Sequence, residues 1–132
     1  DSAFNVRRKQ YSSPDLLEII SEESRGNIGL GLTELDLYSS NLNFVFGQAS
    51  SVTDSAVVSL HRLRASLYGL EDGDIFLERL GKEAVHEVGH VLGLSHCDNS
   101  DCFMYFSNNI LSVDSKGDKL CSNCHNKFKK IY

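Results

Sequence analysis

Hydrophobic and polar residues alternate with different periods in successive segments of the chain, and the first clear period is helical. Leu17 and Ile20 fall on one face of a helix that begins in a leucine-rich stretch. Ser13 is suited to cap the start of this helix, and Gly26 is suited to end it. The pattern therefore predicts an amphipathic helix over residues 14–25.

Three runs farther along the chain are typical of short strands. Residues 28–33 alternate a large apolar residue with glycine or threonine, so one face of this strand carries almost no side chain and accepts close packing. Residues 41–47 and 56–60 are rich in β-branched and aromatic residues. The small polar residues 47–55 between them predict a turn or loop.

A second helical period follows a break of glycine and acidic residues at 69–74. Five apolar residues recur there at spacings of three or four, within roughly 60° of one direction, whereas His86 and His90 lie at about 180° and about 220°. The apolar residues are Leu77, Leu80, Ala84, Val88 and Val91. This segment is predicted to be a helix with an apolar back and a histidine front.

The histidine front has the spacing of a metal site. His86 and His90 are four residues apart, so on a helix their side chains are neighbours and can supply two nitrogen ligands to one zinc ion. Gly93 can adopt the left-handed conformation that ends a helix, which returns His96 toward the same ion. Three protein ligands leave a fourth position open for water. Glu87 lies about 60° round the helix from His90, where it can act as a general base.

Four cysteines follow in two close pairs, Cys97 with Cys102 and Cys121 with Cys124. Two such pairs are typical of a closed tetrahedral site for structural zinc, which would stabilise a polar, irregular C-terminal segment. Two disulfides are an alternative, and they require an oxidising compartment. A second alternative is haem attachment through Cys121-x2-Cys124-His125, but it leaves the other cysteines and the histidine group unexplained.

Composition narrows the classes of function. The chain has 132 residues, of which 41% are hydrophobic, and a formal net charge of −5. This length fits one domain, and the acidic balance disfavours general binding to nucleic acid. No apolar run approaches the roughly 20 residues that span a bilayer, and the first residues do not form a secretory signal. We therefore expect a cytoplasmic monomer with neither membrane nor nucleic-acid partners.

The histidine and cysteine motifs together resemble one known family. His86-Glu-x2-His90-x2-Gly-x2-His96 is the metzincin zinc signature. It continues directly into Cys97-x4-Cys102-x-Met and, after sixteen further residues, Cys-x2-Cys, a combination that closely resembles the archaemetzincin family. Blocks upstream are also similar, so the resemblance covers roughly residues 7–125.

The resemblance implies an α+β fold, a metzincin-like minimal zinc peptidase domain with a mixed, mostly parallel sheet and an active-site helix. Within this single domain of residues 1–132, residues 1–92 would form the N-terminal subdomain and residues 93–132 a zinc-stabilised C-terminal subdomain. The family opens with a further strand, helix and strand that are not found before residue 7. The chain also begins at Asp1 rather than at a methionine. We therefore expect that a segment upstream of Asp1 has been processed, truncated or left out of this sequence.

The resemblance also implies two zinc ions per chain. His86, His90 and His96 would bind the catalytic zinc, and Glu87 would activate a zinc-bound water that hydrolyses a peptide bond. The structural zinc would be bound by Cys97, Cys102, Cys121 and Cys124. Met104 would pack in a turn beneath the site, and an extended peptide or protein substrate would pair with the edge strand of residues 43–49. The alternative function is a zinc-organised peptide-binding or regulatory module with little or no proteolytic activity.

Overall fold

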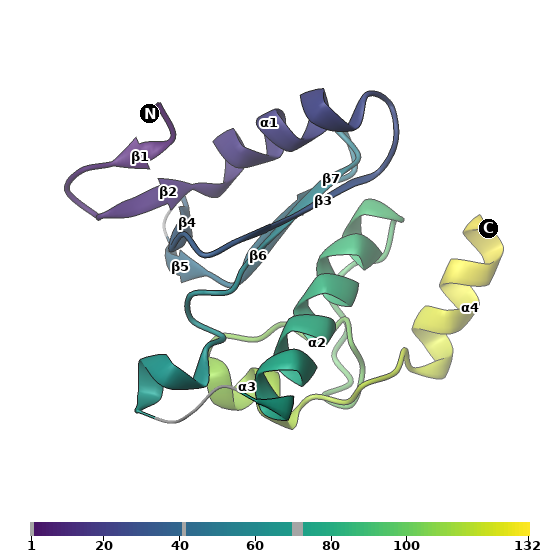
Figure 1. Cartoon of the computed structure of the whole chain (residues 1–132). Helices are drawn as coiled ribbons and strands as arrows, with labels where there is room; N and C mark the ends of the chain where they lie inside the picture. The colour runs from purple at the N-terminus through teal and green to yellow at the C-terminus, as the bar shows by residue number, and fades with distance from the viewer. Residues whose placement is uncertain (1, 41, 70–72) are drawn as a thin grey trace.

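The computed structural model describes residues 2–40, 42–69 and 73–132 as an α+β fold in which helices cover both faces of a layer of strands (Figure 1). The strands are β1 Phe4–Asn5, β2 Gln10–Ser12, β3 Gly29–Thr33, β4 Leu37–Ser39, β5 Leu42–Val45, β6 Gly47–Ser50 and β7 Ser55–Ser59. The helices are α1 Ser13–Ser24, the 3-10 helix η1 Ala65–Tyr68, α2 Asp74–Val91, α3 Ile110–Ser115 and α4 Ser122–Ile131. None of the described helices is long and apolar enough to cross a membrane.

The strands form two sheets, one in the order β1-β2-β4-β5 and the other in the order β3-β7-β6. Among the described residues, β2–β4 and β3–β7 pair in parallel, and the other three strand pairs are antiparallel. The expected α+β class with mixed sheets is confirmed. Parallel pairs are fewer than expected, because short connections join β4 to β5 and β6 to β7, and short connections suit antiparallel neighbours.

The segment between β4 and β7 differs from its prediction. The run 41–47, expected as one strand, is divided at the buried Phe46 into β5 and β6, which lie in different sheets, and Asn41 lies outside the described residues. The loop expected over 47–55 was wrong in its first half, because β6 pairs with β7 along its whole length. The ladder uses backbone groups, so small polar residues can take part in it.

The glycine face of β3 is closely packed, as the alternating pattern predicted, and the element that packs on it is helix α1. A Cβ atom added to Gly29 or Gly31 would lie only 2.7 Å or 2.5 Å from side-chain carbons of Ile20. The helix begins one residue earlier than predicted, so Ser13 is not its cap. The Ser13 hydroxyl instead donates to the carbonyl oxygen of Tyr38 at 3.1 Å, which joins the helix to β4.

Helix α2 begins at the end of the expected break, of which residues 70–72 lie outside the described residues. Its apolar back is only partly a core face: Leu80 and Ala84 pack in the core, but Leu77 is 62% exposed. The most buried polar side chains of α2 lie instead on the histidine front. They are Arg79, Glu83, His86 and Glu87. The spacing of the apolar residues predicted the helix correctly. The C-terminal segment folds over the polar face of this helix, where Asp114 and Lys116 form ion pairs with Arg79 and Glu83.

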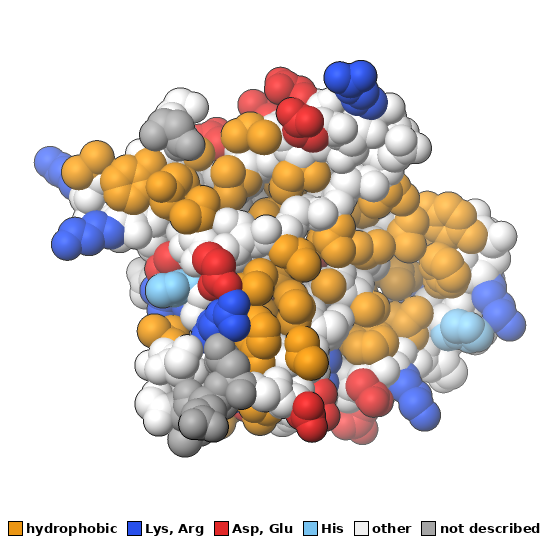
Figure 2. Space-filling model, in the orientation of Figure 1, with side chains coloured by type: hydrophobic (Ala, Val, Ile, Leu, Met, Phe, Trp, Pro, Cys, Tyr) orange, Lys and Arg blue, Asp and Glu red, His pale blue; other side chains and the backbone are white. Residues whose placement is uncertain are grey.

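The segment after α2 contains more regular structure than its composition suggested. Helices α3 and α4 form there, and α4 lies to the side of α2 (Figure 1). Buried and partly buried apolar residues gather around the cysteines, among them Leu94, Met104 and Phe128. Hydrophobic side chains also remain on the surface, where they gather across the middle of the face drawn in Figure 2.

Candidate active site

The three histidines of the predicted metal site converge. His86 and His90 project from α2, and the chain then turns at Gly93, whose φ of 103° is in the left-handed region as predicted. This turn returns His96 toward the helix, and the three imidazoles offer nitrogen atoms that all lie within 4.8 Å of one another. The Nε2 atoms of His86 and His90 are 3.1 Å apart.

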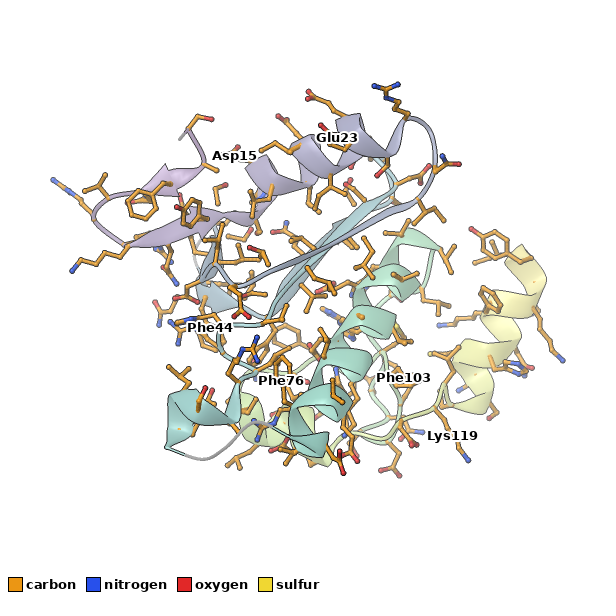
Figure 3. The ribbon with its side chains drawn as sticks, in the orientation of Figure 1. Asp15, Glu23, Phe44, Phe76, Phe103 and Lys119 are labelled. Atoms are coloured by element: carbon orange, nitrogen blue, oxygen red, sulfur yellow. The ribbon has the colours of Figure 1, made fainter. Side chains whose placement is uncertain are left out.

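Backbone carbonyl groups orient two of the rings. His86 Nδ1 lies 2.8 Å from the carbonyl oxygen of Phe103, which Figure 3 labels beside α2, and His90 Nδ1 lies 2.8 Å from that of Leu94. Because a carbonyl oxygen only accepts, each Nδ1 carries the proton and each Nε2 keeps its lone pair for a metal ion. Burial lowers the pKa of His86 to about 3 and also lowers the pKa of His90 and of His96. The rings are therefore neutral at pH 7, as metal binding requires.

This donor set suits zinc. Two nitrogen ligands at about 2.0–2.1 Å from a tetrahedral ion lie roughly 3.4 Å from each other, near the separation of the two Nε2 atoms. His96 is exposed, and all three histidines line a cleft of about 800 Å³. An ion held by these three side chains would keep a position open toward the cleft.

Glu87 lines the same cleft and lies against β6. A Cβ atom added to Gly47 would lie 2.7 Å from Glu87 Oε2, so the glycine is needed for this close approach. Burial is the main cause that raises the pKa of Glu87 to about 8, with a smaller contribution from the Glu83 carboxylate, while the Lys116 ammonium opposes the rise. The sequence does not indicate this role of Gly47, because the residue lies where an expected strand over 41–47 meets an expected loop over 47–55.

An ion pair that sequence reasoning also missed lies beside Glu87. The Lys116 ammonium is 2.8 Å from Glu83 Oε2, and it donates to the carbonyl oxygen of Tyr105 at 3.1 Å. Both charged side chains are buried, at 5% exposure or less. Lys116 therefore fixes the segment around Tyr105 to the active-site helix. The one signal in the sequence was that Glu83 precedes Glu87 by four residues and so shares its helix face.

The four cysteines also converge, and their sulfur atoms all lie within 4.8 Å of one another. All four are free thiols, and the Sγ atoms of Cys97 and Cys121 are 3.7 Å apart, well beyond the roughly 2.05 Å of a disulfide bond. Cys102 and Cys124 are buried, and Cys102 Sγ accepts from two backbone N–H groups. Four converging thiols could hold zinc, and this geometry supports neither two disulfides nor a haem attached to one pair.

Met104 connects the two clusters. It is fully buried, and a Cβ atom added to Gly89 would lie 2.6 Å from its sulfur, so α2 rests directly on this side chain. The backbone N–H of Cys97 donates to the carbonyl oxygen of Met104 at 2.9 Å. Met104 thus packs beneath the histidine group, as the resemblance implied, and ties it to the cysteine group.

Comparisons with known proteins agree with this geometry. The model of peptidase family M54 matches residues 3–130. The archaemetzincin of Methanocaldococcus jannaschii is 45% identical over 128 residues, which are 96% of this chain and 70% of that protein. The archaemetzincin of Natronomonas pharaonis is 43% identical over 128 residues, which are 94% of this chain and 74% of that protein.

Solved structures are similar as well. The crystal structure of a zinc-dependent peptidase from Methanocorpusculum labreanum superimposes with a TM-score of 0.93 at 31% identity, over 96% of this chain and 78% of the other. The crystal structure of the archaemetzincin from Archaeoglobus fulgidus, complexed with malonate, gives a TM-score of 0.84 at 40% identity, over 96% and 74%.

Proposed function

The chain belongs to peptidase family M54, the family of the archaemetzincins, and is a zinc metalloprotease; from this premise we propose that Glu87 is its general base and acid, at a zinc ion held by His86, His90 and His96. The observation that carries the proposal is the buried carboxyl group of Glu87 in the same cleft as three converging, neutral imidazoles. Among the described residues that line this cleft, Glu87 is the one acidic residue next in sequence to a histidine of the group.

Zinc bound by these residues supplies Lewis-acid chemistry, since it lowers the pKa of a coordinated water to about 7 and polarises the scissile carbonyl. Glu87 accepts a proton from the attacking water and then delivers it to the nitrogen of the leaving amine. Burial raises the pKa of the carboxyl group, and a nearby dication favours the carboxylate, so the two effects oppose each other. A carboxyl group balanced in this way can take up a proton and release it in one turnover.

An extended peptide substrate would bind along β6. This strand is an edge of its sheet and contacts α2, and Gly47, Gln48 and Ala49 line the cleft. Backbone groups at a sheet edge can pair with a substrate strand irrespective of its side chains. Of the pairing segment expected over residues 43–49, β6 supplies Gly47, Gln48 and Ala49, whereas the residues before Phe46 belong to β5, the edge strand of the other sheet.

A second, structural zinc completes the proposal. It would be bound by Cys97, Cys102, Cys121 and Cys124, so that the chain holds two zinc ions. Residues 1–92 would then supply the sheet and the active-site helix, and residues 93–132 would be fastened beneath them by the metal. The expectations of a monomeric, cytoplasmic protein without nucleic-acid or membrane partners stay predictions.

Replacement of Glu87 by glutamine tests the proposed mechanism. We expect Glu87→Gln to cleave a peptide library at least about 100-fold more slowly, because proton transfer by a positioned side chain contributes 10²–10⁴-fold. Glu78→Gln, an exposed residue of the same helix, is the matched control and should cleave at the wild-type rate. Unchanged cleavage by Glu87→Gln with its zinc content intact would overturn the role of Glu87. Zinc-dependent binding of a peptide hydroxamate without any cleavage by the wild type would favour the binding module instead.

A further inference from the structure

One end of the active-site cleft contains polar groups that the proposed mechanism does not use. Among the described residues, the Ser107 hydroxyl has no partner, although this residue lines the cleft and is only 8% exposed. Glu83 lines the cleft as well, and its Oε2 is 2.8 Å from the Lys116 ammonium, so this carboxylate already has one partner. A buried polar group left unpaired costs about 1–3 kcal/mol. The Ser107 hydroxyl is therefore suited to a partner that enters from the cleft, and the Glu83 carboxylate can accept a further hydrogen bond beside its contact with Lys116.

The position of these groups relates them to the reaction. Glu83 lies one helical turn before Glu87 on α2, and side chains at this spacing are about 5–6 Å apart. The Lys116 ammonium contacts both Glu83 and the carbonyl oxygen of Tyr105, so the segment that leads to Ser107 lies beside the same turn of α2. A substrate whose scissile bond lies at Glu87 would place an adjacent side chain at this end of the cleft.

The charges at this end favour one class of side chain. Lys116 is buried behind Glu83, so the pair has no net charge. A charged substrate side chain of either sign would lose its hydration here without a free counter-ion, because Glu83 and Lys116 already neutralise each other. An apolar side chain would leave the Ser107 hydroxyl unpaired. A neutral carboxamide has two N–H donors for the Glu83 and Ser107 oxygens and a carbonyl that accepts from the hydroxyl.

We propose that Glu83 and Ser107 form a specificity subsite for a neutral carboxamide side chain, glutamine or asparagine, adjacent to the scissile bond, with Lys116 as the positioning residue that keeps Glu83 neutralised. The inference rests on the proposed function, because it takes the histidine group as the point where substrate binds. Sites built to hydrogen-bond a substrate group discriminate strongly against analogues that lack it.

Peptide hydroxamates that differ in one side chain test the subsite by binding, independently of turnover. With the zinc-loaded protein, the dissociation constants of compounds carrying glutamine, methionine, glutamate or lysine next to the hydroxamate are measured by calorimetry. Glutamine should bind roughly tenfold more tightly than methionine, which has a similar shape but no N–H donors, and more tightly than either charged side chain. Equal affinity for glutamine and methionine, or no binding of any compound, would overturn the inference.

Ser107→Ala separates recognition from a structural role. It should reduce the ratio of glutamine to methionine affinity toward one, whereas Ser95→Ala, in the part of the cleft lining that follows the C-terminal end of α2, should leave the ratio unchanged. The melting temperature of Ser107→Ala should not fall, because the hydroxyl makes no hydrogen bond within the described residues. A lower melting temperature with an unchanged ratio would contradict the subsite.

Peptide cleavage by the same samples distinguishes the inference from the proposed function. Selective hydroxamate binding without cleavage of any peptide would leave the subsite intact and overturn the mechanism. Cleavage with equal kcat/KM for glutamine and methionine peptides, together with equal hydroxamate affinities, would overturn the subsite and leave the mechanism intact.

Discussion

The histidine group and the cysteine group adjoin at His96 and Cys97, yet their surroundings differ. The three histidines line a cleft of about 800 Å³, and His96 is exposed. The four cysteines lie in an apolar cluster, where Cys102 and Cys124 are 0% and 3% exposed. Three donors beside a cleft leave a coordination position for substrate, whereas four donors fill a tetrahedron. Donor number and solvent access, rather than position in the sequence, thus distinguish the proposed catalytic site from the proposed structural one.

Removal of a cysteine ligand should have the largest effect. In Cys124→Ser we expect loss of the structural zinc and unfolding of residues 93–132, because the binding free energy of such a zinc, about 10–16 kcal/mol, is also folding free energy. Amide hydrogen exchange over residues 93–132 measures this directly. If Cys124→Ser kept both its exchange protection and its zinc, the cysteine group would not be the structural site.

A large pH dependence of the free energy of unfolding should come from Glu87, which lies in the cleft beside the histidine group. When the catalytic zinc is removed, burial raises the pKa of Glu87 from 4.5 to about 8, so the folded state binds this proton more tightly than the unfolded state. The stabilisation is complete below the unfolded pKa and is lost as the pH rises through the folded pKa, by up to about 1.4 kcal/mol per pH unit.

Glutamine has no titratable group, so the stability of Glu87→Gln should not fall in this way as the pH rises. Denaturant unfolding of both proteins between about pH 5 and pH 8 gives the comparison. The lowered pKa of His86 contributes equally to the two proteins and cancels. Parallel stability curves would show that the Glu87 carboxyl is not buried as described.

Removal of one histidine should weaken one zinc site and spare the fold. His96→Ala should reduce zinc affinity at the histidine group by roughly 100-fold or more, since even changes to groups that support a ligand cost 10–100-fold. The exposed His61→Ala is the control and should bind zinc as the wild type does. Titration against a chelator of known affinity measures both variants. Loss of zinc from the cysteine group in His96→Ala would contradict the separation of the two sites.

Two glycines of α2 give the smallest and most local comparison. In Gly89→Ala the new methyl group meets the Met104 sulfur at 2.6 Å, so we expect a destabilisation of about 1–3 kcal/mol and weaker zinc binding at both groups. Gly81→Ala meets no atom within 4 Å and should stabilise the helix by up to about 1 kcal/mol. Thermal unfolding measures both changes. If Gly89→Ala were as stable as Gly81→Ala, Met104 would not couple the helix to the segment beneath it.

The sequence predicted best where one element holds the whole pattern. The helical spacing of His86 and His90 and the left-handed turn at Gly93 follow from local geometry, and the structure has both. The bare face of β3 predicted close packing because glycine has no side chain, although the helix that packs there could not be identified.

Long-range contacts could not be read from the sequence. The Glu83–Lys116 pair joins residues 33 positions apart, and nothing in the local pattern of either residue indicates the other. The exposure of Leu77 has the same origin, since periodicity identifies an apolar face but does not show which face the rest of the chain covers. Strand β6 was missed because its pairing depends on β7 and not on its own small residues.

Zinc stoichiometry, followed through stepwise removal, tests the central claim most directly. The account predicts two zinc ions per chain, of which a chelator removes one together with the peptidase activity, while the other is retained until the protein unfolds. Readdition of one zinc equivalent should restore the activity. A chain with a single zinc ion, or one that loses both ions together while folded, would contradict the assignment of an open histidine site and a closed cysteine site.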